Sequence, residues 1–334
     1  MRFGYREACL DHDTGSRHPE TADRLRAIRR GLRKRHGVSY EAGRLAAVDE
    51  LEAVHDPAYV EEVREFCKAG GGSWDADTIA VEETWEAARA AAGLACWAAE
   101  ATLAGADGRD TPFSIGRPPG HHAGTGEAMG FCFFNNAGVA TTDALGRDDG
   151  DRVAVFDWDV HHGNGTQALF YDHADRYYAS VHERGLFPGT GEVPETGGPD
   201  ARRTNLNVPL PGGSGDAEYA TVVEDLLAPS LSRFDPDLLL VSAGFDAHRH
   251  DPISRMRVST EGFGYLTASV RGLADRCDAA LAFVLEGGYG LDALAESVGM
   301  VQEVFDGREP VGPDAPVDDD ARAVIRDVAD AHEL

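Results

Sequence analysis

The stretch Asp157-Trp158-Asp159-Val160-His161-His162-Gly163-Asn164-Gly165 decides the fold of this chain. It follows an apolar run at 153–156 that predicts a buried strand. Residues two apart on a strand point the same way, so Asp157, Asp159 and His161 are expected on one face where the strand ends. A carboxylate beside an imidazole supplies two of the three protein ligands of a catalytic zinc site, although such a pair also caps helices. The stretch therefore predicts a metal site that needs a third ligand, a base and an oxyanion donor.

Length and composition indicate one well-packed domain. The 334 residues are 42% hydrophobic, enough for a sizeable core, and α/β folds of this length often form one domain. No low-complexity linker divides the middle of the chain, and the most linker-like stretch, 312–316, lies near the end. We predict a single domain over residues 1–334, with an acidic C-terminal extension over about 307–334.

The net charge is strongly negative. The chain has 31 basic and 58 acidic residues, a formal charge of −27, and Lys34 and Lys68 are its only lysines. An acidic surface built with arginine rather than lysine stays hydrated in a salt-rich cytoplasm, so we expect a halophilic type of protein. Nucleic-acid binding needs a basic surface, and the composition argues against a nucleic-acid partner.

Cysteine usage and hydropathy predict a cytoplasmic protein. The five cysteines show no Cys-x-x-Cys spacing, so we expect reduced, mostly buried thiols rather than disulfides or a zinc finger. The first residues lack the apolar core of a signal peptide, and no run approaches the roughly 18 apolar residues of a membrane span. We expect no membrane partner, and the sequence leaves the oligomeric state open.

Apolar runs alternate with helical patterns, which predicts an α/β fold with a mainly parallel central sheet and helices on both faces. Strands are expected at 112–115, 153–157, 177–181, 206–208, 238–242 and 281–285, and helices at 19–35, 83–103, 137–145, 217–231, 260–276 and 291–305. Ligands of such folds bind beyond the carboxyl ends of the strands. The polar clusters described next all follow a predicted strand, so we expect them to share one site.

Two clusters offer the missing ligand and base. Gly244-Phe245-Asp246 follows the strand at 238–242, and Asp246 would complete a site of two carboxylates and one imidazole with open positions for water and substrate. A bare aspartate after a strand also forms turns. Gly120-His121-His122 follows the strand at 112–115, and one histidine would have to transfer protons, although an isolated His-His pair is more often structural.

A fourth cluster, Glu286-Gly287-Gly288-Tyr289-Gly290, follows the strand at 281–285. Two glycines before a tyrosine let the backbone crowd the site and direct the phenol inward. The hydroxyl would then donate a hydrogen bond to a developing oxyanion opposite the metal. The alternative is a plain glycine-rich turn that carries a packed aromatic ring.

Together these clusters resemble the histone deacetylase superfamily, which has an arginase-like α/β fold. The resemblance spans roughly residues 9–300 and favours the class II branch, which includes acetylpolyamine and deacetylase-like amidohydrolases. It rests on the stretches quoted above and on four further motifs: His18-Pro19-Glu20, Arg117-Pro118-Pro119-Gly120-His121-His122, Met129-Gly130-Phe131-Cys132-Phe133-Phe134-Asn135-Asn136 and Phe187-Pro188-Gly189-Thr190-Gly191.

The resemblance implies a zinc ion on Asp159, His161 and Asp246, and mixed oxygen and nitrogen ligands leave ferrous iron as an alternative. His122 resembles the general base that takes a proton from water. His121 resembles its electrostatic neighbour.

The remaining catalytic positions are also implied by the resemblance. Asp157 would orient His121, and Tyr289 resembles the tyrosine that polarises the carbonyl. Asn164 stands where some relatives carry an aspartate, and an amide cannot raise imidazole basicity as a carboxylate does. We therefore expect a less basic His122.

A structural potassium ion and a substrate channel are implied as well. The potassium site would comprise Asp157, Asp159, His161, Ser180 and Val181. The channel would be lined by Phe131, Phe187, Gly130 and Ile253.

The expected reaction is hydrolysis of an N-acetyl or N-acyl amide, on acetyl-lysine or a related aliphatic amine. An acetylpolyamine deacetylase is the nearest alternative, although Ile253 offers no charge for a cationic substrate. A two-metal ureohydrolase would need a second ligand set, of which Asp246-Ala247-His248 is only a faint trace. A non-catalytic acyl-amine binding protein is the third alternative.

Overall fold

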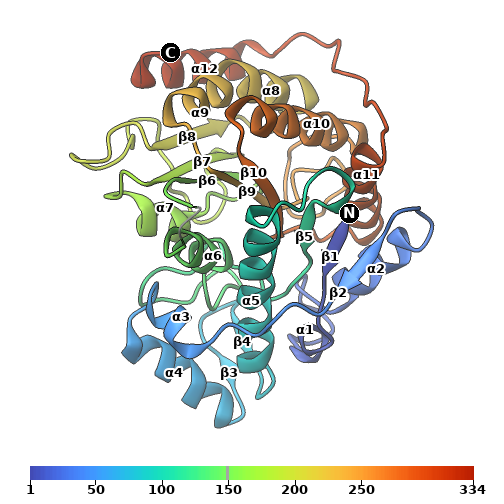
Figure 1. The fold of residues 1–334 in the computed structure, drawn as a ribbon, viewed down its shortest axis with the longest axis vertical. Coiled ribbons are helices and arrows are strands. Elements are labelled where there is room, and N and C mark those ends of the chain that lie inside the picture. The colour runs from blue at the N-terminus through green and yellow to red at the C-terminus, as the bar shows by residue number, and fades with distance from the viewer. Residues whose placement is uncertain (148–149) are drawn as a thin grey trace.

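A parallel sheet forms the centre of the computed structural model, which describes residues 1–147 and 150–334 (Figure 1). Within these residues the sheet has eight strands in the order β2-β1-β5-β10-β9-β6-β7-β8, and every pairing is parallel. The strands are β1 Arg2–Gly4, β2 Ser39–Glu41, β5 Pro112–Ser114, β6 Val153–Asp157, β7 Arg176–Glu183, β8 Asn205–Leu210, β9 Leu238–Ala243 and β10 Ala280–Leu285. A separate antiparallel pair is formed by β3 Gly72–Ser73 and β4 Ile79–Ala80.

Helices connect the strands and cover the sheet. Those before β6 are α1 Ala8–Asp11, α2 Asp23–Leu32, α3 Val48–Glu52, α4 Pro57–Lys68, α5 Thr84–Leu103, the short 3₁₀ helix η1 Gly108–Asp110 and α6 Asn136–Leu145. Those after β6 are α7 Asn164–Phe170, α8 Asp216–Thr221, the π-helical turn η2 Val222–Leu227, α9 Ala228–Phe234, α10 Thr260–Cys277, α11 Leu291–Phe305 and α12 Asp319–His332. No helix of the described residues is long and apolar enough to cross a lipid bilayer.

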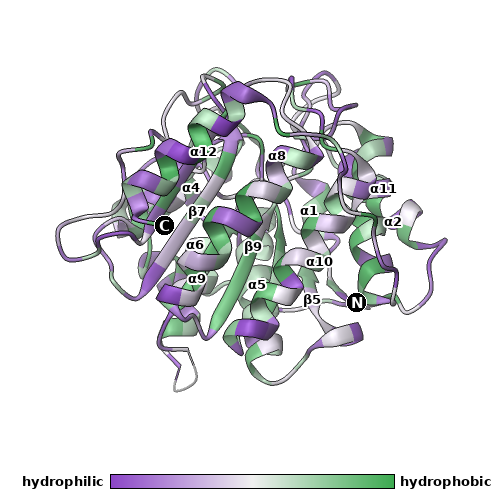
Figure 2. Ribbon diagram, turned by 90° about the horizontal axis from the view of Figure 1, so that it is seen from above, coloured by the Kyte–Doolittle hydropathy of each residue, from purple (hydrophilic) through white to green (hydrophobic). Residues whose placement is uncertain are grey.

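The sheet separates two hydrophobic cores because alternate residues of a strand point to opposite faces. On β6, Ala154 and Phe156 join the core under α2, α10, α11 and α12, whereas Val153 and Val155 join the core under α4, α5 and α6. Both faces are therefore covered, and the central strand β9 is apolar along most of its length (Figure 2). This burial fixes the register of the strands that carry the polar clusters.

The predicted α/β class and parallel sheet are confirmed, and the differences are local. The helix predicted at 217–231 is divided into α8, η2 and α9, and Pro229 near the start of α9 lacks the N–H that a continuous α-helix needs there. The strands β1 and β2 were not predicted, because three residues carry too little pattern. The segment expected to be a C-terminal extension contains α12, whose Val324 and Val328 are buried in the core.

Candidate active site

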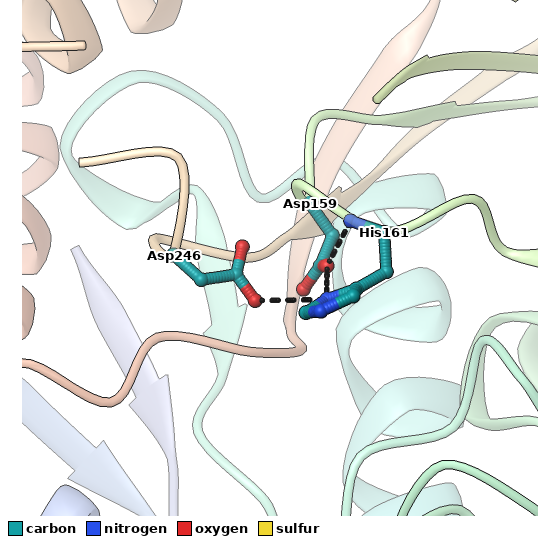
Figure 3. A group of neighbouring side chains, drawn as sticks. All are labelled: Asp159, His161 and Asp246. Carbon is teal, nitrogen blue, oxygen red and sulfur yellow. Dashed lines mark hydrogen bonds and ion pairs between the residues drawn. The ribbon is translucent and has the colours of Figure 1, made fainter. Parts of the chain in front are cut away.

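The three expected metal ligands meet at the carboxyl edge of the sheet. Asp159 and His161 lie just after β6 rather than on it, and Asp246 follows β9. One side-chain ligand atom from each lies within 4.8 Å of the others, and all three residues are buried. Both carboxylates point toward the His161 ring (Figure 3), whose Nδ1 lies 2.9 Å from Asp159 Oδ1 and 3.3 Å from Asp246 Oδ2.

The surrounding backbone shapes this group for a cation. Asp246 Oδ2 is buried and accepts no hydrogen bond from any described residue. A Cβ on Gly244 would lie 2.0 Å from Asp159 Oδ2, and one on Gly287 would lie 2.1 Å from Asp246 Oδ2. Only glycine therefore lets the backbone approach the two carboxylates this closely.

The electrostatics of the three residues also favour a positive charge between them. Burial lowers the pKa of His161, but the hydrogen bond of its Nδ1 to Asp159 and the negative charges of Asp246 and Asp159 outweigh burial and raise the pKa to about 10. Burial and the neighbouring Asp159 raise the pKa of Asp246. Two carboxylates and one imidazole with this preference are a suitable ligand set for a divalent ion such as Zn²⁺.

The two adjacent histidines lie beside this group in different electrostatic environments. His121 Nδ1 lies 3.0 Å from Asp157 Oδ2, and although burial opposes it, the charges of Asp159 and Asp157 raise the pKa of His121 to about 10. Burial, with the charges of His121 and His161, holds the pKa of His122 well below its usual value. The pair thus combines a cationic and a neutral imidazole.

Asn164 fixes which nitrogen of His122 is free. His122 Nδ1 lies 2.8 Å from Asn164 Oδ1, while Asn164 Nδ2 donates to Met129 Sδ at 3.3 Å and so orients the amide. An amide oxygen only accepts hydrogen bonds, so Nδ1 carries the hydrogen and Nε2 keeps its lone pair. The direction of the pKa shift is the one expected from the sequence, but its causes are burial and the neighbouring histidines, and the Asn164 contact acts in the opposite direction.

Tyr289 lies at the rim of the site. Its ring packs against Phe131 with centroids 5.9 Å apart, and the Arg24 guanidinium lies 4.9 Å from its centroid. Burial raises the pKa of the Tyr289 phenol well above its usual value, so the hydroxyl remains a donor at neutral pH. Among the described residues, no hydrogen bond joins this hydroxyl to the three ligands.

Of the expected channel residues, Phe187 and Gly130 lie against His122, whereas Ile253 lies in the loop after β9. The Phe187 ring lies 5.1 Å from that of His122 and is 41% exposed. A Cβ on Gly130 would lie 2.4 Å from His122 Cδ2 and 2.9 Å from Phe187 Cε1, so only glycine fits between them. Ile253 is half-buried in the loop after β9, and its N–H donates to Asp251 Oδ1.

The residues expected around potassium include two of the metal ligands, in the loop after β6; the others lie on β6 and β7. Asp157 Oδ1 accepts a hydrogen bond from the N–H of Asp159, and Oδ2 accepts one from the Tyr178 hydroxyl. Ser180 Oγ lies 2.9 Å from His182 Nδ1, and Val181 is buried on the same strand.

Comparisons with known proteins identify the family of this chain. The histone deacetylase domain matches residues 18–305, which is most of the chain. The chain belongs to the histone deacetylase family. Its members are hydrolases that act on amide bonds, and this chain is therefore a deacetylase-type enzyme of that family.

Several family members are similar over most of their length. A histone deacetylase-like amidohydrolase from Pseudomonas aeruginosa is 41% identical over 301 residues, covering 86% of this chain and 78% of the relative. A probable deacetylase from Methanothermobacter thermautotrophicus is 41% identical over 295 residues, covering 87% of each. The crystal structure of the HDA15 HD domain superposes with a TM-score of 0.91 at 34% identity, covering 99% of this chain and 96% of that one.

Two buried residues that support this site, Glu286 and Arg24, were not assigned this role from the sequence. Glu286 is fully buried and accepts hydrogen bonds from the N–H groups of Gly120 and His121 at 2.7 and 3.2 Å, and burial raises its pKa to about 7. Arg24 is also fully buried and donates to the carbonyls of Gly288 and Glu286. One indication of this role is present in the sequence, because Arg24 is a charged residue beside the apolar stripe of the helix predicted at 19–35.

A second metal site has little support in the described residues, where Asp159, His161 and Asp246 form the only group suited to an ion. His248 Nε2 lies 3.1 Å from Thr260 Oγ1, and its Nδ1 accepts a hydrogen bond from the N–H of His250. Both ring nitrogens are therefore engaged away from Asp246.

Proposed function

We propose that the chain is a zinc-dependent deacetylase that hydrolyses the N-acetyl amide of acetyl-lysine or a related N-acylated aliphatic amine. The observation that carries this proposal is the buried Asp159-His161-Asp246 group with a neutral imidazole, His122, whose ring centroid lies 5.8 Å from that of His161. Amide hydrolysis needs a Lewis acid next to a proton acceptor, and this arrangement supplies sites for both.

The chemistry follows from the state of each side chain. A divalent ion bound by the three ligands would polarise the amide carbonyl and acidify water. His122 Nε2 then takes the proton of the attacking water, and Asn164 holds the ring through Nδ1. His121, charged beside Asp157, stabilises the negative charge that develops. A histidine of this pair returns a proton to the leaving amine.

Tyr289 is proposed to donate a hydrogen bond to the developing oxyanion. Loss of one such donor costs about 3 kcal/mol, or on the order of a hundredfold in rate. The variant Tyr289→Phe should therefore keep its metal but lose most turnover. Tyr40→Phe is the matched control, because Tyr40 is 41% exposed and lies on β2, a strand at the side of the sheet rather than among the central strands that carry the site. A near-wild-type rate for Tyr289→Phe would refute this role.

Acetyl-lysine is proposed as the substrate class ahead of acetylpolyamines. The channel side chains Phe131 and Phe187 are aromatic and suit an acyl-lysine stem, and Ile253 supplies no negative charge for a second ammonium group. An acidic surface nevertheless attracts cations at low salt, which keeps acetylpolyamines as the alternative.

One panel of assays tests the proposal. Release of the free amine would be followed from an acetyl-lysine peptide, acetylputrescine and longer acyl-lysine peptides in high potassium chloride. The enzyme would first be stripped with a chelator and then given Zn²⁺ or Fe²⁺. We expect metal-restored cleavage that is fastest on the acetyl-lysine peptide. Faster turnover of acetylputrescine would favour the polyamine alternative, and acyl ligand binding without amine release would favour a non-catalytic protein.

We also propose a structural potassium ion beside Asp157 and Ser180, and a cytoplasmic location. The five cysteines are all free, which supports a reducing compartment. Replacing potassium with a large organic cation at constant ionic strength should lower the melting temperature if the ion is structural. An unchanged melting temperature would contradict it.

A further inference from the structure

A cavity of about 850 Å³ lies away from the candidate active site. It opens between the 196–204 loop, the end of α9 and the end of α12, and it also borders the residue before β6. Its lining includes Arg152, Arg202, Arg203, Arg233, Tyr171 and Glu333. This volume is in the range of small-molecule sites, which is roughly 300–1000 Å³.

The cavity lies at the amino ends of the strands, whereas the active site lies at their carboxyl ends. Arg152 immediately precedes β6, and Thr204 immediately precedes β8. Asp157, at the other end of β6, belongs to the active site. At about 3.3 Å per residue, a five-residue strand separates the two by roughly 16 Å. The cavity is therefore a separate site.

The lining has a charge opposite to that of the protein. The whole chain has 58 acidic residues against 31 basic ones. Around this cavity four arginines converge, and among the residues that the structure describes Glu333 supplies the only carboxylate side chain of the lining. Three excess positive charges in one concavity of an acidic protein create a local field that attracts anions.

Only some of these arginine side chains have carboxylate or carbonyl partners within the described part of the protein. Arg203 forms an ion pair with Glu333, and Arg233 donates hydrogen bonds to the carbonyls of His332 and Glu333 at 3.0 and 3.2 Å. For Arg202 and Arg152, no carboxylate of residues 1–147 or 150–334 lies within 4.0 Å. The Arg152 guanidinium instead lies 4.9 Å from the Phe234 ring centroid.

A buried histidine, His332, lies next to the cavity residues Ala331 and Glu333. His332 is 1% exposed, and neither ring nitrogen has a hydrogen-bond partner among the described residues. Burial, together with the smaller effect of the charges of Arg233 and Arg203, lowers the pKa of His332 to about 4. A positive charge on His332 is therefore unfavourable at this position.

We propose that this cavity binds a small molecule that carries two or more phosphate groups. Guanidinium groups form paired, charge-assisted hydrogen bonds with phosphate oxygens, and several arginines are needed to neutralise an oligophosphate. The cavity is much larger than a single phosphate ion. Tyr171 adds an aromatic ring to the lining, so either a nucleoside triphosphate or a bare polyphosphate chain has the required chemistry.

Glu333 acts as an internal competitor in this proposal. Its carboxylate pairs with Arg203 from the last turn beyond α12, and its side chain is 70% exposed. A phosphate bound to Arg203 would have to displace it. Removing the charge of Glu333 should therefore tighten binding, whereas removing the charge of Arg202 should weaken it. A purely structural arginine cluster predicts neither change.

Calorimetric titration of the metal-loaded full chain with tripolyphosphate and with ATP tests the proposal, at low salt and again in high potassium chloride. We expect Arg202→Gln to weaken binding by about tenfold and Glu333→Gln to tighten it severalfold. Arg64→Gln is the matched control, because Arg64 is also an exposed arginine, lies on α4 away from the cavity and pairs with Glu61. Tighter binding of ATP would identify a nucleotide, and equal affinity would identify the phosphate chain; both support the site.

Oligophosphates also chelate divalent metals, and Arg202→Gln controls for this because it leaves Asp159, His161 and Asp246 intact. The proposal fails if wild-type protein binds neither probe at low salt. It also fails if Arg202→Gln binds as tightly as wild type, or if Arg64→Gln weakens binding equally, since diffuse surface charge would then explain the titration.

Discussion

Replacing Gly130 with alanine would test whether the position of His122 controls the rate. Gly130 has φ +55°, and an added Cβ would lie 2.4 Å from His122 Cδ2. Ordinary contact begins at 3.4 Å, so the imidazole would have to move by about 1 Å. A catalytic group displaced by about 1 Å loses on the order of a hundredfold in rate. The left-handed backbone adds a stability cost of about 1–2 kcal/mol.

We therefore expect kcat/KM of Gly130→Ala on an acetyl-lysine peptide to fall on the order of a hundredfold, or about 2.7 kcal/mol of activation free energy. Metal content should remain at one ion per chain, because the clash does not reach Asp159, His161 or Asp246. Gly124→Ala is the matched control, since a Cβ there meets no atom within 4 Å. Wild-type turnover by a folded Gly130→Ala enzyme would refute the role assigned to His122.

Three further outcomes follow from the described contacts. Gly244→Ala would place a Cβ 2.0 Å from Asp159 Oδ2 and so displace a metal ligand. Elemental analysis of the purified variant should find less than about half an equivalent of divalent metal per chain. A full equivalent would contradict the assigned ligand group. Glu20→Gln removes the carboxylate that pairs with buried Arg24 and Arg117, and it should lower the free energy of unfolding in urea by about 3–5 kcal/mol. The control Asp23→Asn removes a carboxylate from an exposed pair and should change this free energy by less than about 1 kcal/mol. Burial lowers the pKa of His55 to about 4, so the unfolded chain binds its proton more readily and stability should fall by up to about 3 kcal/mol as pH drops from about 6.5 to about 4. His55→Gln should flatten that part of the stability profile, and an unchanged slope would show that His55 does not titrate in this way.

The central strands were predictable because their residues are apolar, as burial on both faces of the sheet requires. Leu238–Ala243 and Ala280–Leu285 are continuous apolar runs bounded by turn residues, the pattern of strands covered on both faces. The terminal strand Arg2–Gly4 has no such pattern. It becomes a strand because it pairs on both sides, with Ser39–Glu41 and Pro112–Ser114, and such distant pairing is invisible to a local reading.

The metal ligands were predictable for a similar reason, since each follows an apolar strand and such ends meet at one edge of a parallel sheet. The supporting groups were harder to find. Arg24 lies in a helix with several exposed arginines, and only folding shows that it is fully buried against the carbonyls of Gly288 and Glu286. The arginine cavity was also missed, because its lining comes from five separate parts of the chain.

The fold assigns reaction and selectivity to segments that can diverge separately. Asp159, His161 and Asp246 sit within four residues of a central strand, where tight packing leaves little freedom for substitution. Phe187 and Ile253 lie on longer loops after β7 and β9 that are partly open to solvent. Mutations in those loops can change which amide substrate binds while the metal ligands stay in place. Substrate specificity can therefore evolve from one acyl group to another without a change in the catalytic residues.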